Sequence, residues 1–236
     1  MTISENIMNI REEIAQAAKE VGRDPKEILL CAATKMNDTK NIRAAIEGGI
    51  DCCGENRVQE LVQKLSEHAY DGVPIHFIGH LQTNKVKQVV GNVDLIQSVD
   101  SERLLEAIQK EAKKKSIVQN ILLEVNIADE ESKSGFTKNE LYDLLPKITL
   151  YSNVHVLGFM TIPPICQKSG ENDKFFQEMY NLSVDITAKK YDNISVRFLS
   201  MGMSDDYKDA IRCGSNMIRI GTAIFGARDY SNTQHQ

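Results

Sequence analysis

The spacing of apolar residues along the chain changes after about the first twenty positions. Up to that point apolar side chains recur at steps of three or four, which is the period of one face of an α-helix. They are Ile3, Ile7, Ile10, Ile14, Ala17 and Val21. Gly22 follows, and glycine is typical of the residue that ends a helix. The N-terminal segment is therefore predicted to be one amphipathic helix.

Beyond Gly22 the pattern consists of short apolar runs of strand length. They lie near residues 28–34, 50–53, 75–78, 93–97, 118–127, 154–160, 194–199 and 217–220. Segments of helical length and period separate them. Two examples are residues 101–112, with Asp100 or Ser101 as a plausible N-cap, and the stretch from Phe175 to Ile186. The chain is thus expected to alternate eight strands with helices.

Strands that alternate with helices form parallel βαβ units, and eight such units after a leading helix match a (β/α)8 barrel. The alternative is a doubly wound open sheet, but no G-x-G-x-x-G follows the first strand. No linker-like stretch divides the chain. We therefore predict an α/β fold, a single-domain (β/α)8 TIM barrel over residues 1–228 with an additional N-terminal helix. The polar tail at 229–236 is expected to fray.

Composition excludes several classes of protein. The net charge of -5 argues against a general nucleic-acid binder. No run of 18 apolar residues and no signal-peptide pattern occurs, so a cytoplasmic protein without a membrane segment is expected. The five cysteines form no C-x-x-C pair, which favours reduced thiols over a zinc site. His76 and His80 straddle a strand end, so no metal site is predicted, and His76 is expected inside the barrel or at its rim.

A lysine ends the first apolar run, "LLCAATK", at Lys35. In a barrel this places an amine at the carboxyl end of a strand, where ligand chemistry is found. Loss of hydration on an inner wall would lower the lysine pKa below about 10.4 and leave more neutral amine to attack a carbonyl. Lys35 is therefore the candidate nucleophile.

Phosphate-binding chemistry is expected across the barrel, after the last two strands. In "SMGMSDD", Ser204 is predicted to cap the helix that contains Tyr207, and Gly202 allows close backbone approach. Gly221 and Thr222 can supply amides and a hydroxyl. Arg219 alternates with Ile218 and Ile220, so it is expected to point inward and to need an anion or acceptor.

An aldehyde-reactive lysine opposite a phosphate pocket fits two classes of barrel. One class is the Schiff-base aldolases that act on sugar phosphates, and the other is the proteins that hold pyridoxal 5'-phosphate (PLP). The segments "ATKMN", "GENRVQE", "HFIGHLQTNK", "SMGMSDDY" and "RIGTAIFGAR" occur in this order across nearly the whole chain. In these motifs the chain resembles the YggS/PROSC family of PLP homeostasis proteins, which resemble the barrel domain of alanine racemases.

The resemblance implies roles for particular positions. It places the Schiff-base lysine at Lys35, a residue that lines the cofactor ring at Asn56, and the arginine that faces the pyridine nitrogen at Arg219. It places the phosphate-binding residues at Ser204, Gly221 and Thr222, with Met201 and Gly202 in the same pocket wall. Three positions depart from the family's pattern: Arg57 stands for a common tyrosine, Thr34 for serine and Cys53 for phenylalanine.

The resemblance also implies a function in intracellular PLP (vitamin B6) and amino-acid homeostasis, without catalysis. An arginine at the ring nitrogen weakens the electron sink that PLP enzymes use. The chain ends nine residues after Ala227, so the β-domain that supplies a racemase's second base is not expected. The alternative is a PLP-dependent amino-acid racemase with His80, Lys85 or Tyr207 as the base. PLP-dependent apo-enzymes are the expected recipients, and a monomer is expected.

Overall fold

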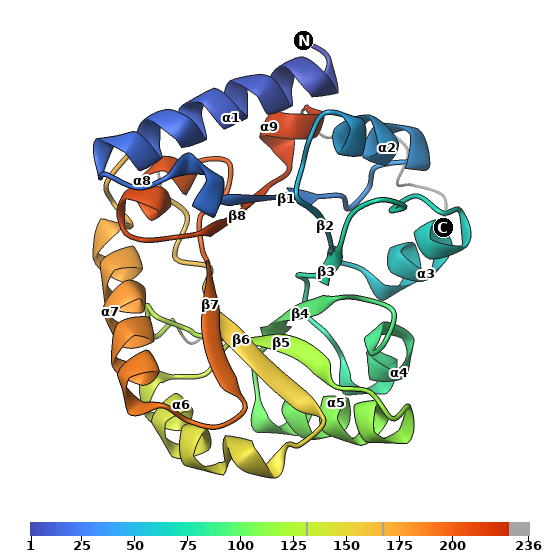
Figure 1. The fold of residues 1–236 in the computed structure, drawn as a ribbon, viewed down its shortest axis with the longest axis vertical. Coiled ribbons are helices and arrows are strands. Elements are labelled where there is room, and N and C mark those ends of the chain that lie inside the picture. Colours follow the sequence, from blue (N-terminus) through green and yellow to red (C-terminus); the bar gives the residue numbers. More distant parts are fainter. Residues whose placement is uncertain (131, 167, 227–236) are drawn as a thin grey trace.

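In the part of the chain that the structure describes, residues 1–130, 132–166 and 168–226, eight parallel strands close into a barrel in chain order (Figure 1). This structure is a computed structural model. Closure follows from β1, which pairs in parallel with both β2 and β8. The strands are β1 (Leu29–Ala33), β2 (Cys52–Glu55), β3 (Ile75–Phe77), β4 (Leu95–Val99), β5 (Gln119–Glu124), β6 (Val154–Met160), β7 (Ile194–Ser200) and β8 (Met217–Ile220).

Helices form the outer layer of the molecule (Figure 1). They are α1 (Ile3–Glu20), α2 (Thr39–Glu47), α3 (Val58–Ser66), α4 (Val86–Val89), α5 (Glu102–Lys114), α6 (Lys138–Leu144), α7 (Asp173–Lys189), α8 (Tyr207–Arg212) and α9 (Thr222–Phe225). Short 3-10 turns lie at η1 (Pro25–Glu27), η2 (Thr83–Lys85) and η3 (Leu145–Leu150). Across the described ranges, no helix is both long and apolar enough to cross a membrane.

The predicted (β/α)8 barrel with its leading helix is confirmed. Every predicted strand-length run overlaps one observed strand, and the run predicted at 154–160 coincides with β6. The predicted cap of α5 is Ser101, whose hydroxyl accepts a hydrogen bond from the Leu104 amide at 3.4 Å. The predicted boundary at 228 and the tail at 229–236 lie outside the described residues.

Two apolar layers follow from the alternation of side chains along each strand. Side chains such as Cys31, Leu95 and Met217 pack with one another in the interior of the barrel. Their neighbours along the strands, among them Ile218 and Ile220, pack outward in the larger cluster that the helices cover. Polar residues of the inner face therefore meet inside the barrel, whichever strand carries them.

Helix α1 completes the outer layer beside the junction of β8 and β1 (Figure 1). It packs against α2, α8 and α9 and buries Ile7, Ile10 and Ile14. A capping box fixes its start, since the Thr2 hydroxyl accepts from the Glu5 amide and the Glu5 carboxylate accepts from the Thr2 amide. The N-terminal helix and the last described helix are thus neighbours.

Candidate functional site

Lys35 lies at the carboxyl edge of the barrel, two residues beyond the end of β1. Its side chain is half-buried, and the preceding Thr34 is fully buried. The Thr34 amide donates a hydrogen bond to the Gly54 carbonyl at 2.9 Å, which continues the pairing of β1 with β2. The predicted position at the barrel mouth is confirmed.

The two peptide units that flank Lys35 are both held by side chains of α3. Lys64 Nζ donates to the Thr34 carbonyl at 2.9 Å. Glu60 Oε2 accepts from the Met36 amide at 2.7 Å. Because Lys64 and Glu60 also pair with each other at 2.8 Å, they form one clamp across the backbone of Lys35.

The carboxylate of Glu55 anchors this clamp inside the protein. Glu55 is fully buried and accepts from Lys64 Nζ at 2.7 Å and from the Tyr70 hydroxyl at 3.2 Å. It also accepts from the backbone amides of Asn56 and Arg57, at 2.7 Å and 3.1 Å. A buried charge is tolerated when donors satisfy it in this way. Glu55 therefore ties the turn after β2 to the strand that leads to Lys35.

A cavity of about 260 Å³ opens at the barrel mouth between these turns. It is lined by Asn56, Ile78, Gly79, His80, Glu124, Val125, Lys133, Ser134 and Ile162. Asn56 Oδ1 is buried and has no hydrogen-bond partner among the residues that the structure describes. A buried polar atom without a partner costs free energy, so a ligand donor in this cavity would stabilise it.

Glu124, the last residue of β5, lines the same cavity. Burial, with a smaller contribution from Asp100, raises the pKa of its carboxyl to about 7. We did not predict this residue from the sequence. The sequence does contain the relevant pattern, because Glu124 ends the apolar run "NILLE" in the same way as Lys35 ends the run before it.

Arg219 points into the barrel, as the alternation along β8 predicts, and it is almost fully buried. Its guanidinium donates to Ser200 Oγ at 2.6 Å and to the Thr161 carbonyl at 2.9 Å. Burial lowers the pKa of Arg219 from its ordinary value. The acceptors predicted for Arg219 are therefore the Ser200 hydroxyl of β7 and the Thr161 carbonyl in the turn after β6.

Hydrogen bonds continue from Arg219 across the barrel interior. Ser200 Oγ donates to Gln97 Oε1 at 2.6 Å, and Gln97 Nε2 lies 2.9 Å from His76 Nδ1. His76 is buried, which confirms its predicted place inside the barrel. The inner wall thus carries a connected polar chain from Arg219 to His76.

The loop after β7 packs tightly against α8 at Gly202. Gly202 has φ +97°, and a Cβ there would lie 2.7 Å from the Ala210 Cβ and 2.9 Å from the Tyr207 Cα. The preceding Met201 is fully buried in the outer apolar cluster, so its side chain faces the helices. Gly202 therefore lies close to α8, and the close backbone approach to a phosphate predicted for this glycine stays a prediction.

Gly221 lies beside the end of β1, since a Cβ on it would be 3.4 Å from the Ala33 Cβ. Helix α9 begins at the next residue, Thr222, whose side chain is exposed. The turn after β8 therefore stands next to the strand end that leads to Lys35. On the other side of β1 lies β2, which ends directly before Asn56.

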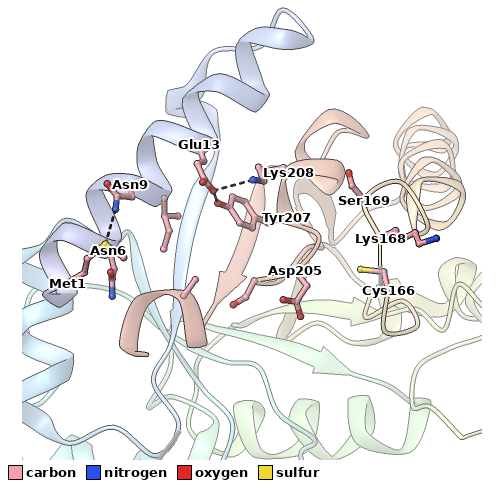
Figure 2. Close-up of a pocket in the computed structure, with 13 residues that line it drawn as sticks. Met1, Asn6, Asn9, Glu13, Cys166, Lys168, Ser169, Asp205, Tyr207 and Lys208 are labelled. Atoms are coloured by element: carbon pink, nitrogen blue, oxygen red, sulfur yellow. Dashed lines mark hydrogen bonds and ion pairs between the residues drawn. The ribbon is translucent and has the colours of Figure 1, made fainter. Parts of the chain in front are cut away.

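A larger cavity, of about 580 Å³, opens beside the loops after β7 and β8 (Figure 2). Ser204 and Ala223, the residue after Thr222, both line it. Helix α1 contributes Asn6, Asn9 and Glu13 to the wall, and Glu13 accepts a hydrogen bond from the Tyr207 hydroxyl (Figure 2). The cavity thus borders Ser204 after β7 and Ala223 of α9, whereas Gly221 and Thr222 are not among its lining residues in the described part of the chain.

The prediction that Ser204 caps the following helix is wrong. Helix α8 begins at Tyr207 with Asp206 in the N-cap position. The Asp206 carboxylate accepts from the Met203 amide at 2.7 Å, and residues 204–206 form an additional turn before the helix. This bond closes a turn before the helix begins, so Ser204 lies in that turn, where it lines the cavity.

Comparison with known proteins covers nearly the whole chain. The profile of the family described as "Alanine racemase, N-terminal domain" matches residues 6–229. A protein of Pasteurella multocida named "Pyridoxal phosphate homeostasis protein" is 37% identical over 98% of this chain and 100% of its own length. One of the same name from Aquifex aeolicus is 39% identical, with coverage of 98% and 100%. PipY of Synechococcus elongatus, solved with PLP bound, superposes with a TM-score of 0.83 at 28% identity and covers 95% of this chain and 100% of its own.

Proposed function

Because the chain belongs to the family of pyridoxal phosphate homeostasis proteins, we propose that it binds PLP at the carboxyl end of its barrel, with Lys35 as the Schiff-base residue. Its role is to hold and release PLP in intracellular PLP and amino-acid homeostasis. The observation that carries the proposal is the half-buried Lys35, held by the α3 clamp at the end of β1, while the paired strand β2 leads to Asn56 with its unpartnered buried oxygen.

The phosphate is proposed to bind across the barrel mouth from Asn56. Ser204 lines the 580 Å³ cavity, and Gly221, which precedes Thr222 at the start of α9, lies next to Ala33 at the end of β1. Gly202 lets the loop after β7 approach α8 closely enough to form this wall. Ser204, Gly221 and Thr222 are therefore proposed as the anion site.

Arg219 is proposed to stand at the ring nitrogen and to keep it unprotonated. When bound, PLP supplies an electron sink for reactions of amino acids, and that sink is strongest with a protonated ring nitrogen. The hydrogen bonds to Ser200 Oγ and the Thr161 carbonyl fix the guanidinium. A cation held there disfavours a second positive charge nearby. This arrangement favours a carrier over a catalyst.

One observation favours the alternative, an amino-acid racemase. Glu124 lines the Asn56 cavity with a pKa of about 7, which suits a group that exchanges protons near neutral pH. Two of the three bases expected from the sequence, Tyr207 and His80, are less suitable. The Tyr207 hydroxyl is bonded to Glu13, and burial raises its pKa. His80 is 64% exposed beside Asp100. Solvent deuterium incorporated at the α-carbon of an amino acid, dependent on Lys35 and Glu124, would support racemization.

The first experiment is an absorbance spectrum of the purified protein with PLP, before and after borohydride, followed by mapping of the labelled peptide. We expect visible absorbance that borohydride removes and a label on the peptide that contains Lys35. The Lys35→Ala variant should lose both signals. Lys40→Ala, at an exposed position on the adjacent α2, should keep them. A borohydride-stable adduct that persists in Lys35→Ala would refute the Schiff-base assignment.

The cellular setting is part of the proposal. We propose a cytoplasmic monomer that passes PLP to PLP-dependent apo-enzymes. Light scattering on the purified chain should give a mass near 26.5 kDa, and a mass of twice this value would contradict the monomer. Transfer is tested by mixing the borohydride-free holoprotein with a PLP-dependent apo-enzyme and measuring recovered activity against the same amount of free PLP.

A further inference from the structure

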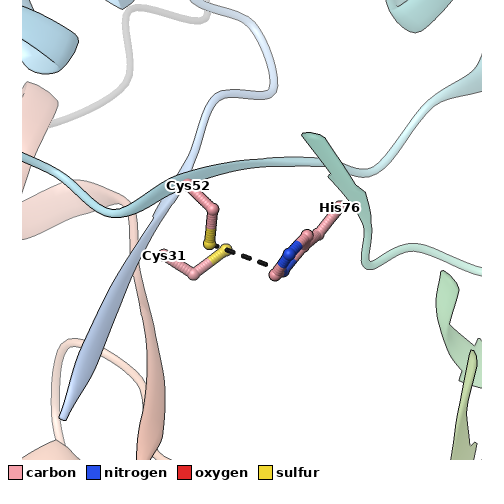
Figure 3. Close-up of side chains that lie close together, drawn as sticks. All are labelled: Cys31, Cys52 and His76. Carbon is pink, nitrogen blue, oxygen red and sulfur yellow. Dashed lines mark hydrogen bonds between the residues drawn. The ribbon is translucent and has the colours of Figure 1, made fainter. Parts of the chain in front are cut away.

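Two thiols and an imidazole meet inside the barrel, on strands that carry the proposed PLP site at their ends. They are Cys31 of β1, Cys52 of β2 and His76 of β3 (Figure 3). One candidate ligand atom from each residue lies within 4.8 Å of the others, and all three side chains are buried. In the sequence they are 21 and 24 residues apart, so spacing motifs do not reveal the cluster.

Strand register explains why these side chains share one space. Cys31 lies directly opposite Cys52, and His76 lies opposite Gly54, two residues after Cys52 on the same face. Gly54 leaves the space between them open, because a Cβ there would lie 2.8 Å from Cys31 Sγ. The three donors are therefore fixed by regular backbone of neighbouring strands rather than by a flexible loop.

We propose that Cys31, Cys52 and His76 bind one thiophilic d10 metal ion, Zn²⁺ or Cu⁺, inside the barrel. Thiolates select soft or borderline ions, and imidazole suits both zinc and copper. Mg²⁺ and Ca²⁺ prefer oxygen ligands, and the cluster contains no carboxylate among the described residues. Three protein ligands are also the number found in zinc sites that keep an open fourth position.

The charges around the cluster suit a metal bound by two thiolates. Each thiol that binds the metal loses its proton to solvent, because its S–H bond breaks as the metal–sulfur bond forms. Two thiolates neutralise Zn²⁺, and Arg219, opposite Cys31 in register, balances the extra charge with Cu⁺.

His76 Nδ1 is the ring nitrogen next to the thiols, 3.4 Å from Cys52 Sγ. Gln97 Nε2 lies 2.9 Å from the same nitrogen, so a metal ion bound at Nδ1 replaces that contact. Gln97 is held in turn by Ser200, so the cluster and Arg219 belong to one hydrogen-bonded chain.

The test uses full-length, tag-free, reduced protein expressed in medium supplemented with zinc or with copper, because a buried site is most easily filled during folding. After exchange against a competing chelator, we expect about one retained ion per chain by elemental mass spectrometry, and the retained element tells Zn²⁺ from Cu⁺. Cys31→Val, Cys52→Ser and His76→Gln should each reduce retention at least about tenfold. Cys53→Ala is the matched control, since Cys53 packs in the outer apolar cluster.

X-ray absorption at the edge of the retained metal identifies the ligand atoms around it in the unmutated protein. This result does not depend on whether a variant folds. Two sulfur ligands and at least one nitrogen ligand are expected. The proposal is overturned if the protein retains no ion, if the ion has no sulfur ligands, or if retention survives all three ligand variants. It is also overturned if peptide mapping of the purified protein shows a disulfide between Cys31 and Cys52.

Discussion

At the scale of single residues, Gly202 sets how closely the loop after β7 can approach α8. We expect Gly202→Ala to lower the free energy of unfolding by about 1–3 kcal/mol and to weaken PLP binding, because φ +97° disfavours a side chain and the added Cβ would meet Ala210 and Tyr207. Urea unfolding and PLP titration measure the two effects.

Gly49→Ala is the matched control for this change. Gly49 also has a positive φ, +92°, but no heavy atom lies within 4 Å of a Cβ built on it. It should therefore show the conformational cost without the steric conflict and without the loss of PLP affinity. Equal effects of the two substitutions on PLP binding would contradict the role given to the close approach.

Glu124 gives a prediction about pH. Its folded-state pKa of about 7 exceeds the ordinary value of 4.5, so the folded protein binds more protons between these values than the unfolded chain. The free energy of unfolding of the PLP-free protein should therefore fall as pH rises through this range, by up to about 3 kcal/mol from this residue. Glu124→Gln should remove this part of the pH dependence, whereas Glu106→Gln, on an exposed face of α5, should not. If the free energy of unfolding varied with pH in the same way in the wild type and in Glu124→Gln, the raised pKa assigned to Glu124 would be contradicted.

Individual site residues could be predicted from the sequence where a strand dictates direction. Arg219 was predicted inward from its two isoleucine neighbours, and Lys35 was predicted at a strand end from the apolar run before it. Ser204 was predicted as a helix cap and is not one, because the Asp206 side chain closes an earlier turn. Cys31, Cys52 and His76 could not be grouped, since strand register, and not sequence spacing, brings them together.

At the scale of elements, α3 acts on Lys35 through the backbone. Lys64→Met removes the only cation that the described hydrogen bonds give to the buried Glu55 carboxylate, so we expect a loss of about 3–5 kcal/mol in the free energy of unfolding. The carbonyl of Thr34 also loses its donor. The rate of reaction of PLP with Lys35 should fall as well, measured by the growth of visible absorbance.

A double-mutant cycle separates these contributions. Glu55→Gln combined with Lys64→Met removes both charges, so the double variant should be less destabilised than the sum of the two single variants. The slower reaction of Lys35 should persist in it, because the Thr34 carbonyl still lacks its donor. Additive effects on stability would show that the ion pair is not the source of the cost.

The positions of most strands could be predicted because those strands are largely buried on both faces and therefore read as mainly apolar runs, although β7 is only partly buried and carries the exposed Arg197. The 3-10 segments and the start of α8 could not, because local hydrogen bonds decide them. Residues 144–150 illustrate this: α6 ends at Leu144 and the chain continues as η3 through Pro146, with no change in apolar content to mark the boundary.

At the scale of the whole molecule, α1 joins the start of the described chain to its end. Asn6 Nδ2 donates to the Ile224 carbonyl at 2.8 Å and so holds the turn of α9 that follows Gly221 and Thr222. We expect Asn6→Ala to weaken PLP affinity by roughly 2–10-fold, the effect of one lost hydrogen bond. Asn9→Ala, on the same helix and in the same cavity wall, should leave the affinity unchanged. Equal losses of PLP affinity in the two variants would show that the cavity wall, and not the hydrogen bond to α9, accounts for the effect.

The pairing of β1 with β8 has a consequence for how the protein acquires its cofactor during synthesis. Lys35 leaves the ribosome before Ser204, Arg219 and Gly221, which follow it by about 170 to 186 residues. A nascent chain of intermediate length therefore carries the reactive amine without the residues proposed to bind the phosphate. Capture of PLP in the complete site must wait until β8 and Gly221 have been made, and shorter nascent chains are expected to hold PLP no better than an ordinary lysine does.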